Sequence, residues 1–263
     1  MKTKNLKKIL AVALVCVMLA AVLAACGAKE KVIIGITDNP PMNYQENGKW
    51  TGFETDFTIE VCKILGLEAE FLLIDWGAKE IEVNSGTIDA VWNGMTITPQ
   101  RAEEMDISIP YMNNGQVLVV RAEDEDKYKG LDLAGAGVVA EMGSTLEETI
   151  KSHAMFANVN YTGVDKQITG LLEVKARTAD VTLVDLTLAA ETIKPGTDYA
   201  DLVYIEVPDF VEQFGVALRK GSDSFEGAKI TLKDLNDAIK KLQDNGKLLE
   251  IAKKYNLEDL LVK

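Results

Sequence analysis

The fold is decided by residues 53–92, which read FETDFTIEVCKILGLEAEFLLIDWGAKEIEVNSGTIDAVW. Its first part predicts a helix, because apolar residues recur at i, i+4, i+7 and i+8 as Phe57, Val61, Ile64 and Leu65. Gly66 ends this helix. A strand over 69–74, a short helix around 79–84 and a strand over 88–92 follow. Strands that alternate with helices predict an α/β fold with a largely parallel sheet.

The second half of the chain repeats this plan. We expect strands over 136–140, 158–161 and 181–184, and helices over 145–152 and 165–176. Asp89 and Asp180 occupy equivalent places at the start of a strand in the two halves, which predicts two similar lobes. The segments 116–120 and 214–218 resemble each other and are predicted to be hinge strands between the lobes.

The composition excludes several functions. Of 263 residues 47% are hydrophobic, which excludes disorder, and the net charge of −13 argues against nucleic acid. Three cysteines exclude a disulfide scaffold, and Cys62 is predicted to lie in the core. His153 is the only histidine; it is predicted to be a solvated helix residue, and its isolation argues against a metal site and against Ser-His-Asp or Cys-His catalysis. No cofactor is expected.

The N-terminus predicts a secretory signal over residues 1–25. Four lysines precede an apolar run over 9–22 that is too short to span a bilayer, and Leu23-Ala-Ala-Cys26 follows. This last segment resembles a bacterial lipobox, which implies cleavage before Cys26 and lipid attachment to that cysteine. The alternative is an ordinary signal peptide cut near Ala25. Residues 26–31 would be a lipidated tether.

Six stretches together carry a family resemblance: Gly52–Phe57, Asn84–Ala90, Met95–Arg101, Gly143–Thr145, Asp180–Asp185 and Asp244–Tyr255. In order and spacing they resemble the bacterial extracellular solute-binding proteins, family 3, the receptors of ATP-driven importers of polar amino acids. The resemblance implies a type II periplasmic-binding-protein fold with a ligand cleft between two lobes. Lobe 1 would comprise residues 32–119 and 214–263, and lobe 2 residues 120–213.

Arg101 is the first candidate ligand residue, and its position supports this independently. Thr98 is predicted to cap a helix and Pro99 to open it, which places Arg101 in the first turn. A cation at this positive end of the helix suits a bound anion rather than helix stability. The alternative is an ion pair with Glu104 or Asp106, which would contribute only about 0.5 kcal/mol at an exposed site.

Thr96, Asn93 and Gly94 are further candidates in the loop after the strand over 88–92. Ligands bind at the carboxyl ends of strands in open α/β sheets. The resemblance assigns the α-groups of an amino acid to the Thr96 hydroxyl and to backbone groups of Asn93 and Gly94. Ordinary turn chemistry is the alternative.

Ser144, Thr145 and Asp185 are the candidates from lobe 2. Ser144 and Thr145 begin a helix and could simply cap it, but the resemblance assigns the ligand carboxylate to Thr145. Asp185 ends a strand, where it could hold an α-ammonium group or cap the next helix. The resemblance favours the ammonium role.

The expected aromatic wall of the ligand pocket departs from the family pattern. Asn39 stands where relatives carry a stacking aromatic residue, which weakens the case for a stacked cationic side chain. Trp76 could supply this wall and Trp92 is the weaker alternative, although a tryptophan is often a core residue. Leu146 replaces a commonly polar residue, which implies a less polar subsite for the ligand side chain.

The resemblance implies a monomeric, lipid-anchored receptor at the extracellular face of the cell membrane, periplasmic if an outer membrane is present. It would bind a free α-amino acid and deliver it to an importer's permease and ATPase. One alternative is an enzyme of this fold similar to cyclohexadienyl dehydratases, with Glu54 or Asp38 as the acid. Another is a sensor ectodomain, which is expected to continue into a transmembrane helix.

Overall fold

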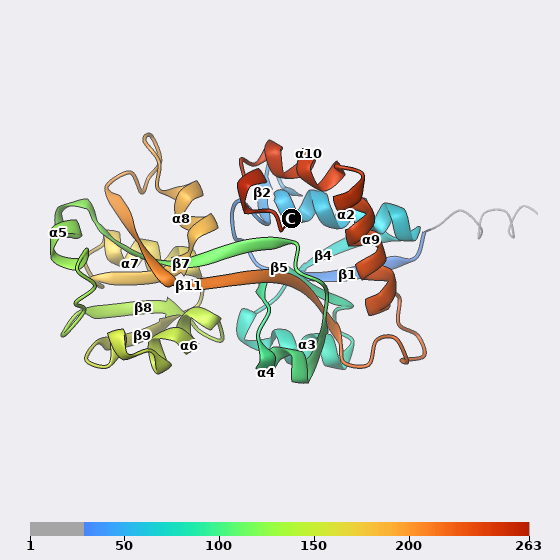
Figure 1. The fold of residues 1–263 in the computed structure, drawn as a ribbon, viewed down its shortest axis with the longest axis horizontal. Coiled ribbons are helices and arrows are strands. Elements are labelled where there is room, and N and C mark those ends of the chain that lie inside the picture. Colours follow the sequence, from blue (N-terminus) through green and yellow to red (C-terminus); the bar gives the residue numbers. More distant parts are fainter. Residues whose placement is uncertain (1–28, 263) are drawn as a thin grey trace, which may run out of the picture.

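The computed structural model describes residues 29–262 as two lobes lying side by side (Figure 1). The predicted signal peptide over 1–25 and the predicted lipid site at Cys26 lie outside the described residues. Within 29–262, no helix has the length and apolarity needed to cross a membrane.

Lobe 1 contains a half of the main sheet with helices on both of its faces. Its helix α2 (Phe53–Leu65) has the predicted bounds, and Gly66 ends it in the left-handed conformation at φ 75°. The other elements of its N-terminal part are β1 (Lys31–Ile36), β2 (Tyr44–Glu46), β3 (Lys49–Thr51), β4 (Glu68–Leu73), η1 (Trp76–Ala78), α3 (Lys79–Ser85), β5 (Ala90–Thr96), α4 (Pro99–Glu104) and β6 (Met105–Ile107).

Lobe 2 repeats the alternation of strands and helices. Its helix α6 (Thr145–Ser152) also has the predicted bounds. The other elements are η2 (Ala122–Asp124), α5 (Glu125–Tyr128), β8 (Gly137–Glu141), η3 (Ala154–Phe156), β9 (Asn160–Val164), α7 (Gln167–Lys175), β10 (Val181–Asp185) and α8 (Leu186–Thr192).

Two long strands, β7 (Met112–Arg121) and β11 (Leu202–Arg219), join the lobes. The strand order is β4-β1-β5-β11-β7-β10-β8-β9, with β6 also paired to β11. The outer pairs are parallel, whereas β7 and β11 run antiparallel to each other and to their neighbours β10 and β5. The largely parallel sheet predicted above is therefore wrong at its centre, because a chain that crosses on β7 and returns on β11 reverses its direction.

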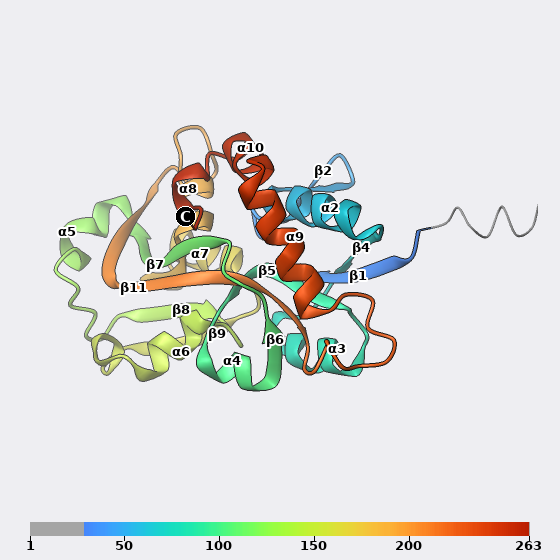
Figure 2. The same ribbon diagram turned by 45° about the vertical axis from the view of Figure 1, so that its right-hand side comes forward.

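The terminal helices α9 (Leu232–Asp244) and α10 (Lys247–Lys254) pack on lobe 1, followed by η4 (Glu258–Leu260) (Figure 2). Leu235 and Ile239 of α9 share a buried cluster with Phe57 and Cys62 of α2, and Cys62 is 2% exposed. This apolar surface is the partner that the two amphipathic helices need.

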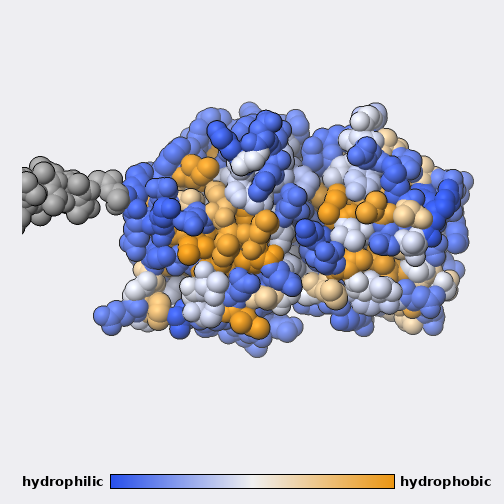
Figure 3. Space-filling view, turned by 180° about the vertical axis from the view of Figure 1, so that it is seen from behind, coloured by the Kyte–Doolittle hydropathy of each residue, from blue (hydrophilic) through white to orange (hydrophobic). Residues whose placement is uncertain are grey.

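Each lobe has a hydrophobic core of its own. Lobe 2 buries Val138, Leu146 and Leu183 in a cluster separate from that of lobe 1. We therefore propose the division into residues 32–119 with 214–263 and residues 120–213. Seen from behind, apolar residues form patches on both lobes within a largely hydrophilic surface (Figure 3).

Several predicted boundaries were displaced by tertiary contacts. The strand expected over 88–92 is β5 (Ala90–Thr96), because the Asp89 side chain accepts a hydrogen bond from the Ile33 backbone just before the strand begins. The strand expected over 158–161 is β9, whose parallel pairing with β8 begins only at Asn160. The helix expected over 165–176 is the shorter α7.

Candidate functional site

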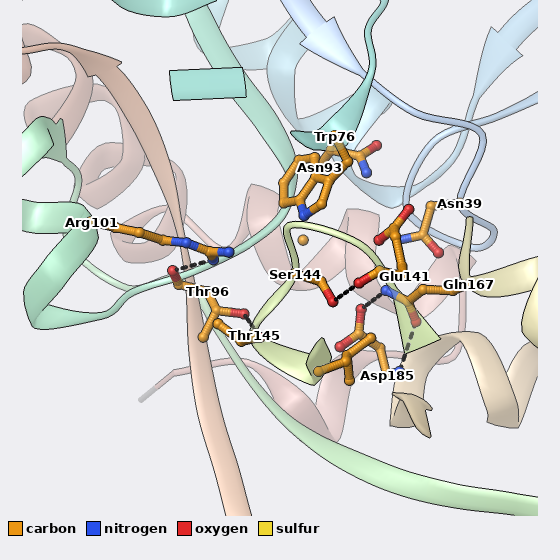
Figure 4. A pocket seen from close by; sticks show the side chains of 12 residues that line it. Asn39, Trp76, Asn93, Thr96, Arg101, Glu141, Ser144, Thr145, Gln167 and Asp185 are labelled. Atoms are coloured by element: carbon orange, nitrogen blue, oxygen red, sulfur yellow. Dashed lines mark hydrogen bonds between the residues drawn. The ribbon is translucent and has the colours of Figure 1, made fainter. Parts of the chain in front are cut away.

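A pocket lies between the lobes, and Figure 4 shows its side chains. Lobe 1 contributes the carboxyl end of β5, the start of α4, the β1–β2 loop and η1, and lobe 2 contributes strand ends and the starts of α6 and α7. The residues that line it are Asn39, Trp76, Asn93, Gly94, Thr96, Arg101, Glu141, Ser144, Thr145, Leu146, Gln167 and Asp185. The structure thus brings all the predicted ligand residues to one pocket.

Arg101 lies in the first turn of α4, which Thr98 caps by accepting a hydrogen bond from the Arg101 backbone at 3.2 Å. Only 4% of the residue is exposed. Its Nη1 donates to the Thr96 carbonyl at 3.1 Å and its Nη2 to the Gly143 carbonyl at 3.5 Å. Burial lowers the pKa of Arg101, but a guanidinium keeps its charge in proteins.

The predicted alternative for Arg101 was a surface ion pair. Among residues 29–262 the structure contains no ion pair between Arg101 and Glu104 or Asp106, and Asp106 instead lies 3.7 Å from the Lys220 ammonium. The guanidinium is thus a buried cation whose hydrogen bonds within the protein go to neutral carbonyl oxygens. A bound anion would stabilise its charge.

Thr96 and Thr145 face each other across the two lobes, with 3.3 Å between their hydroxyl oxygens. The neighbouring Ser144 has a structural role: it caps α6 by accepting from the Glu147 backbone, and it donates to the Glu141 carbonyl at 2.5 Å. The Thr145 hydroxyl also accepts from Gln116 and donates to Glu212, each at 3.3 Å, so it lies where polar groups of both lobes meet.

Asp185 ends β10 and lies at the start of α8, but its side chain does not cap that helix. Its carboxylate accepts from Asn114 at 3.0 Å and from Gln167 at 2.6 Å. Burial raises the pKa of Asp185 well above its ordinary value, and the negative charge of Glu212 adds to this rise. A bound ammonium group would oppose both effects.

Asn93 and Gly94 line the pocket, but several of their polar groups are already bonded. The Asn93 side chain accepts from the Thr37 backbone at 2.9 Å and from Asn43 at 3.0 Å. The Gly94 N–H donates to Glu54 at 2.8 Å. This N–H cannot also donate to a ligand, which narrows the expected backbone contact of Gly94 to its carbonyl group.

Glu54 is the centre of a buried network behind the pocket. It is fully buried and accepts from Tyr111, Asn43 and the Gly94 backbone. Burial raises its pKa to about 7, although these hydrogen bonds oppose the rise. The contacts of Glu54 thus join α2 to β5.

The aromatic side of the pocket is formed by Trp76 in η1, which is 6% exposed. The Lys79 ammonium lies 4.8 Å from the centre of its ring. Trp92 is fully buried instead, with its ring 5.0 Å from Phe57 in an edge contact. Trp92 is thus a core residue, and the prediction of Trp92 as an alternative wall is wrong.

Three acidic or amide residues at this site were not predicted from the sequence. Glu141 and Gln167 line the pocket beside Leu146, so its wall is more polar than Leu146 suggested. Glu212 on β11 accepts from Thr96 at 3.0 Å and from Asn114 at 2.6 Å. A polar residue at a strand end, the signal that indicated Asp185, could also have indicated Glu141.

The two lobes touch each other around the pocket. Lys79 in lobe 1 donates to the Gly143 carbonyl in lobe 2 at 2.8 Å. Gly143 has a φ of 71°, and a Cβ there would lie 2.9 Å from the Gly77 Cα of the opposite lobe. Glycine at 143 thus permits both the turn before α6 and the close approach of the lobes.

The fold and the cleft define a two-lobed solute-binding protein. Residues 32–258 match the family model of the bacterial extracellular solute-binding proteins, family 3. The chain belongs to this family.

Similar proteins have been described under names that state their ligands. The chain is 30% identical over 256 residues to the L-cystine-binding protein TcyJ of Escherichia coli strain K12, covering 94% of this chain and 92% of that protein. The structure resembles an ancestral arginine-binding protein bound to arginine, with a TM-score of 0.78, 29% identity and coverage of 86% and 98%. It also resembles an ABC uptake transporter substrate-binding protein from Streptococcus pneumoniae with bound histidine, with a TM-score of 0.78, 28% identity and coverage of 89% and 95%.

Proposed function

We propose that this protein binds a free α-amino acid between its lobes as the substrate-binding component of an ABC importer. The observation that carries the proposal is the charge arrangement of the pocket. Arg101 from lobe 1 lacks an anionic partner and Asp185 from lobe 2 lacks a cationic one among the described residues. An α-amino acid supplies a carboxylate for the first and an ammonium for the second.

We assign the α-carboxylate to Arg101 and Thr145, and the α-ammonium to Asp185 with Thr96. These groups come from both lobes, so a ligand that binds them all stabilises the contact between lobes. Such closure would present a surface that the permease subunits can distinguish from the open form. The ATPase subunits of the importer would then act through the permease. A monomer is sufficient for this role.

Binding without a chemical step fits the site better than the alternative enzyme. Glu54, one candidate acid, lies behind the pocket with its carboxylate bonded to Tyr111, Asn43 and Gly94. Asp38, the other candidate, is exposed and does not line the pocket. Neither lines the pocket that contains Arg101 and Asp185, whereas a general acid must lie within hydrogen-bond reach of its substrate.

A thermal-shift screen of the purified protein against the common amino acids and cystine tests this function. The protein is first unfolded and refolded so that no ligand is carried over. A ligand that binds only the folded state raises the unfolding midpoint with its concentration. If no α-amino acid raises the midpoint, the proposed function is wrong. Turnover of a prephenate-type substrate would favour the enzyme.

We also propose that Cys26 carries a lipid that holds the protein at the extracellular face of the membrane. Two acyl chains anchor a protein firmly, whereas one gives marginal binding. Cys26→Ser should release the protein into the medium or leave its precursor uncleaved. Metabolic labelling with a fatty acid checks this, and absence of label in the wild-type protein would contradict it.

A further inference from the structure

Glu141 is an acidic residue of the pocket that neither the α-carboxylate nor the α-ammonium group of an amino acid needs as a partner. It ends β8, is 5% exposed and lines the pocket. Its backbone carbonyl accepts from Ser144, but within residues 29–262 its carboxylate takes part in no hydrogen bond and no ion pair. A buried acid without a partner is costly unless a ligand supplies one.

Lys79 is the cation of the protein that acts most strongly on Glu141, ahead of Lys166, but its ammonium is otherwise engaged. Its Nζ donates to the Trp76 carbonyl at 3.2 Å and to the Gly143 carbonyl at 2.8 Å, and it lies 3.0 Å from Glu80. An ammonium has three N–H donors, and these contacts use them. The charge of Lys79 lowers the pKa of Glu141, yet burial dominates and raises it to about 8.

The surroundings of Glu141 suit a donor-rich group. Figure 4 shows Glu141 near Asn39 and Gln167, on the side of the pocket away from Arg101. The Gln167 amide is bonded to Asp185, whereas the described residues offer the Asn39 side chain no hydrogen bond. Glu141 and Asn39 thus present unused acceptors to the pocket, and the Trp76 ring lines the same space.

Acidic side chains also outnumber basic ones among the residues that line the pocket. A zwitterion bound to Arg101 and Asp185 neutralises both of these residues but leaves Glu141 unpaired, with Glu212 as a further acid beside Thr96. A ligand whose side chain carries a positive charge would balance Glu141 directly.

We propose that Glu141 binds the positively charged side chain of the ligand, so that the protein selects cationic α-amino acids. This inference rests on the function proposed above. It concerns only the part of the pocket that holds the side chain of the ligand. Asn39 cannot stack on that side chain as an aromatic residue would, so Glu141 binds it by an ion pair instead.

Arginine and citrulline test this inference, because they have nearly the same shape and differ in the charge at the end of the side chain. Titration calorimetry on the refolded protein should give at least tenfold tighter binding of arginine. In Glu141→Gln the affinity for arginine should fall at least tenfold, while the affinity for citrulline should change less than threefold. This variant should therefore bind arginine and citrulline with nearly equal affinity.

Glu125→Gln is a matched control, because Glu125 is an exposed acid of the same lobe that does not line the pocket. It should keep the arginine-to-citrulline ratio within threefold of wild type. The wild-type comparison needs no variant, so the inference can be tested even if Glu141→Gln does not fold, which circular dichroism would show.

Equal wild-type affinities for arginine and citrulline would overturn the inference, as would tighter binding of cystine or glutamine than of arginine, lysine and histidine. Full charge selectivity in a folded Glu141→Gln protein would also overturn it. In each of these outcomes an amino acid still binds, so the proposed function stands. Failure of every amino acid to bind would instead refute the proposed function and this inference together.

Discussion

The two lobes are built alike at their strand starts, away from the cleft, but carry opposite charge at the strand ends that face it. In each lobe an aspartate at a strand start accepts a backbone hydrogen bond from a neighbouring strand: Asp89 from Ile33 at 2.7 Å, and Asp180 from Gly137 at 2.9 Å. Each also contacts a cation, Lys229 at 2.8 Å for Asp89 and Arg121 at 3.2 Å for Asp180. Asp89 and Asp180, with these partners, thus form the same frame in both lobes.

The site itself is divided between the lobes. Lobe 1 places the Arg101 cation in the first turn of α4, whereas lobe 2 places Asp185 and Glu141 at the ends of β10 and β8. Neither lobe alone can satisfy both charges of a zwitterion. A zwitterionic ligand should therefore favour the closed form of this protein.

Removal of the lobe 1 cation should have the largest effect. Arg101→Ala should weaken amino-acid binding by about 2–5 kcal/mol, a loss of roughly 30-fold or more, because the ligand carboxylate loses a desolvated ionic partner. Arg101→Lys should restore little, since a point charge cannot reproduce the two-pronged guanidinium. Titration calorimetry measures the loss, and circular dichroism checks the fold. Binding within threefold of wild type would show that Arg101 does not contact the ligand.

The buried acid network of lobe 1 should make stability depend on pH. Glu54 has a folded-state pKa of about 7, above its unfolded value of about 4.5, so the folded state binds the proton more tightly. Its stabilising contribution is present below about pH 4.5 and is lost as pH rises to about 7, amounting to about 3 kcal/mol.

Urea unfolding of wild type and Glu54→Gln at pH 5 and pH 8 tests this prediction. The free energy of unfolding of wild type relative to the variant should be lower at pH 8 than at pH 5. Glu103→Gln, an exposed acid of lobe 1, serves as the control and should show no such change. A difference independent of pH would mean that Glu54 keeps one protonation state throughout.

Removal of the lobe 2 charge should have a smaller effect on binding. Asp185→Asn keeps the size of the side chain and should weaken binding by about 1.5–3 kcal/mol, because a hydrogen bond to a charged group becomes one between neutral partners. The exposed Asp198→Asn in the same lobe should leave the affinity unchanged. If both variants bind as wild type does under calorimetry, Asp185 does not hold the ammonium.

Substitutions in the frame formed by Asp89 and Asp180 should have the smallest effects, and only on the stability of the fold. Asp89→Asn and Asp180→Asn should each lower the free energy of unfolding by about 1 kcal/mol through weaker backbone hydrogen bonds. The Gly137 N–H lowers the pKa of Asp180. This contribution is therefore present above pH 4 and fades as the pH falls below about 4.

Urea unfolding at pH 7 and pH 3 measures both variants. The destabilisation by Asp180→Asn should be smaller at pH 3, because below its ordinary pKa this carboxylate takes up a proton more readily in the unfolded state than in the folded state. An effect that grows at pH 3 would contradict this account of the frame.

The sequence by itself determined the alternation of strands and helices and the helix starts that carry the site. The period of Phe57, Val61 and Ile64 predicts α2, and Thr98 with Pro99 predicts α4, because caps and periodicity are local properties. The strand-end rule and the family resemblance also led to the candidates that line the pocket, from Asn39 to Asp185.

Only the tertiary structure decided which polar groups remain free to bind a ligand. Asn93, Ser144 and the Gly94 N–H are bonded within the protein, whereas Arg101 and Glu141 are not paired with any charge among residues 29–262. The cap formed by Ser144 is local, but sequence spacing cannot reveal the other bonds, because their partners are distant in the chain, as with Glu54 and Gly94 or Thr96 and Glu212. The antiparallel strands β7 and β11 connect the two lobes. The pocket residues come from both lobes, so they meet only when the whole chain is folded.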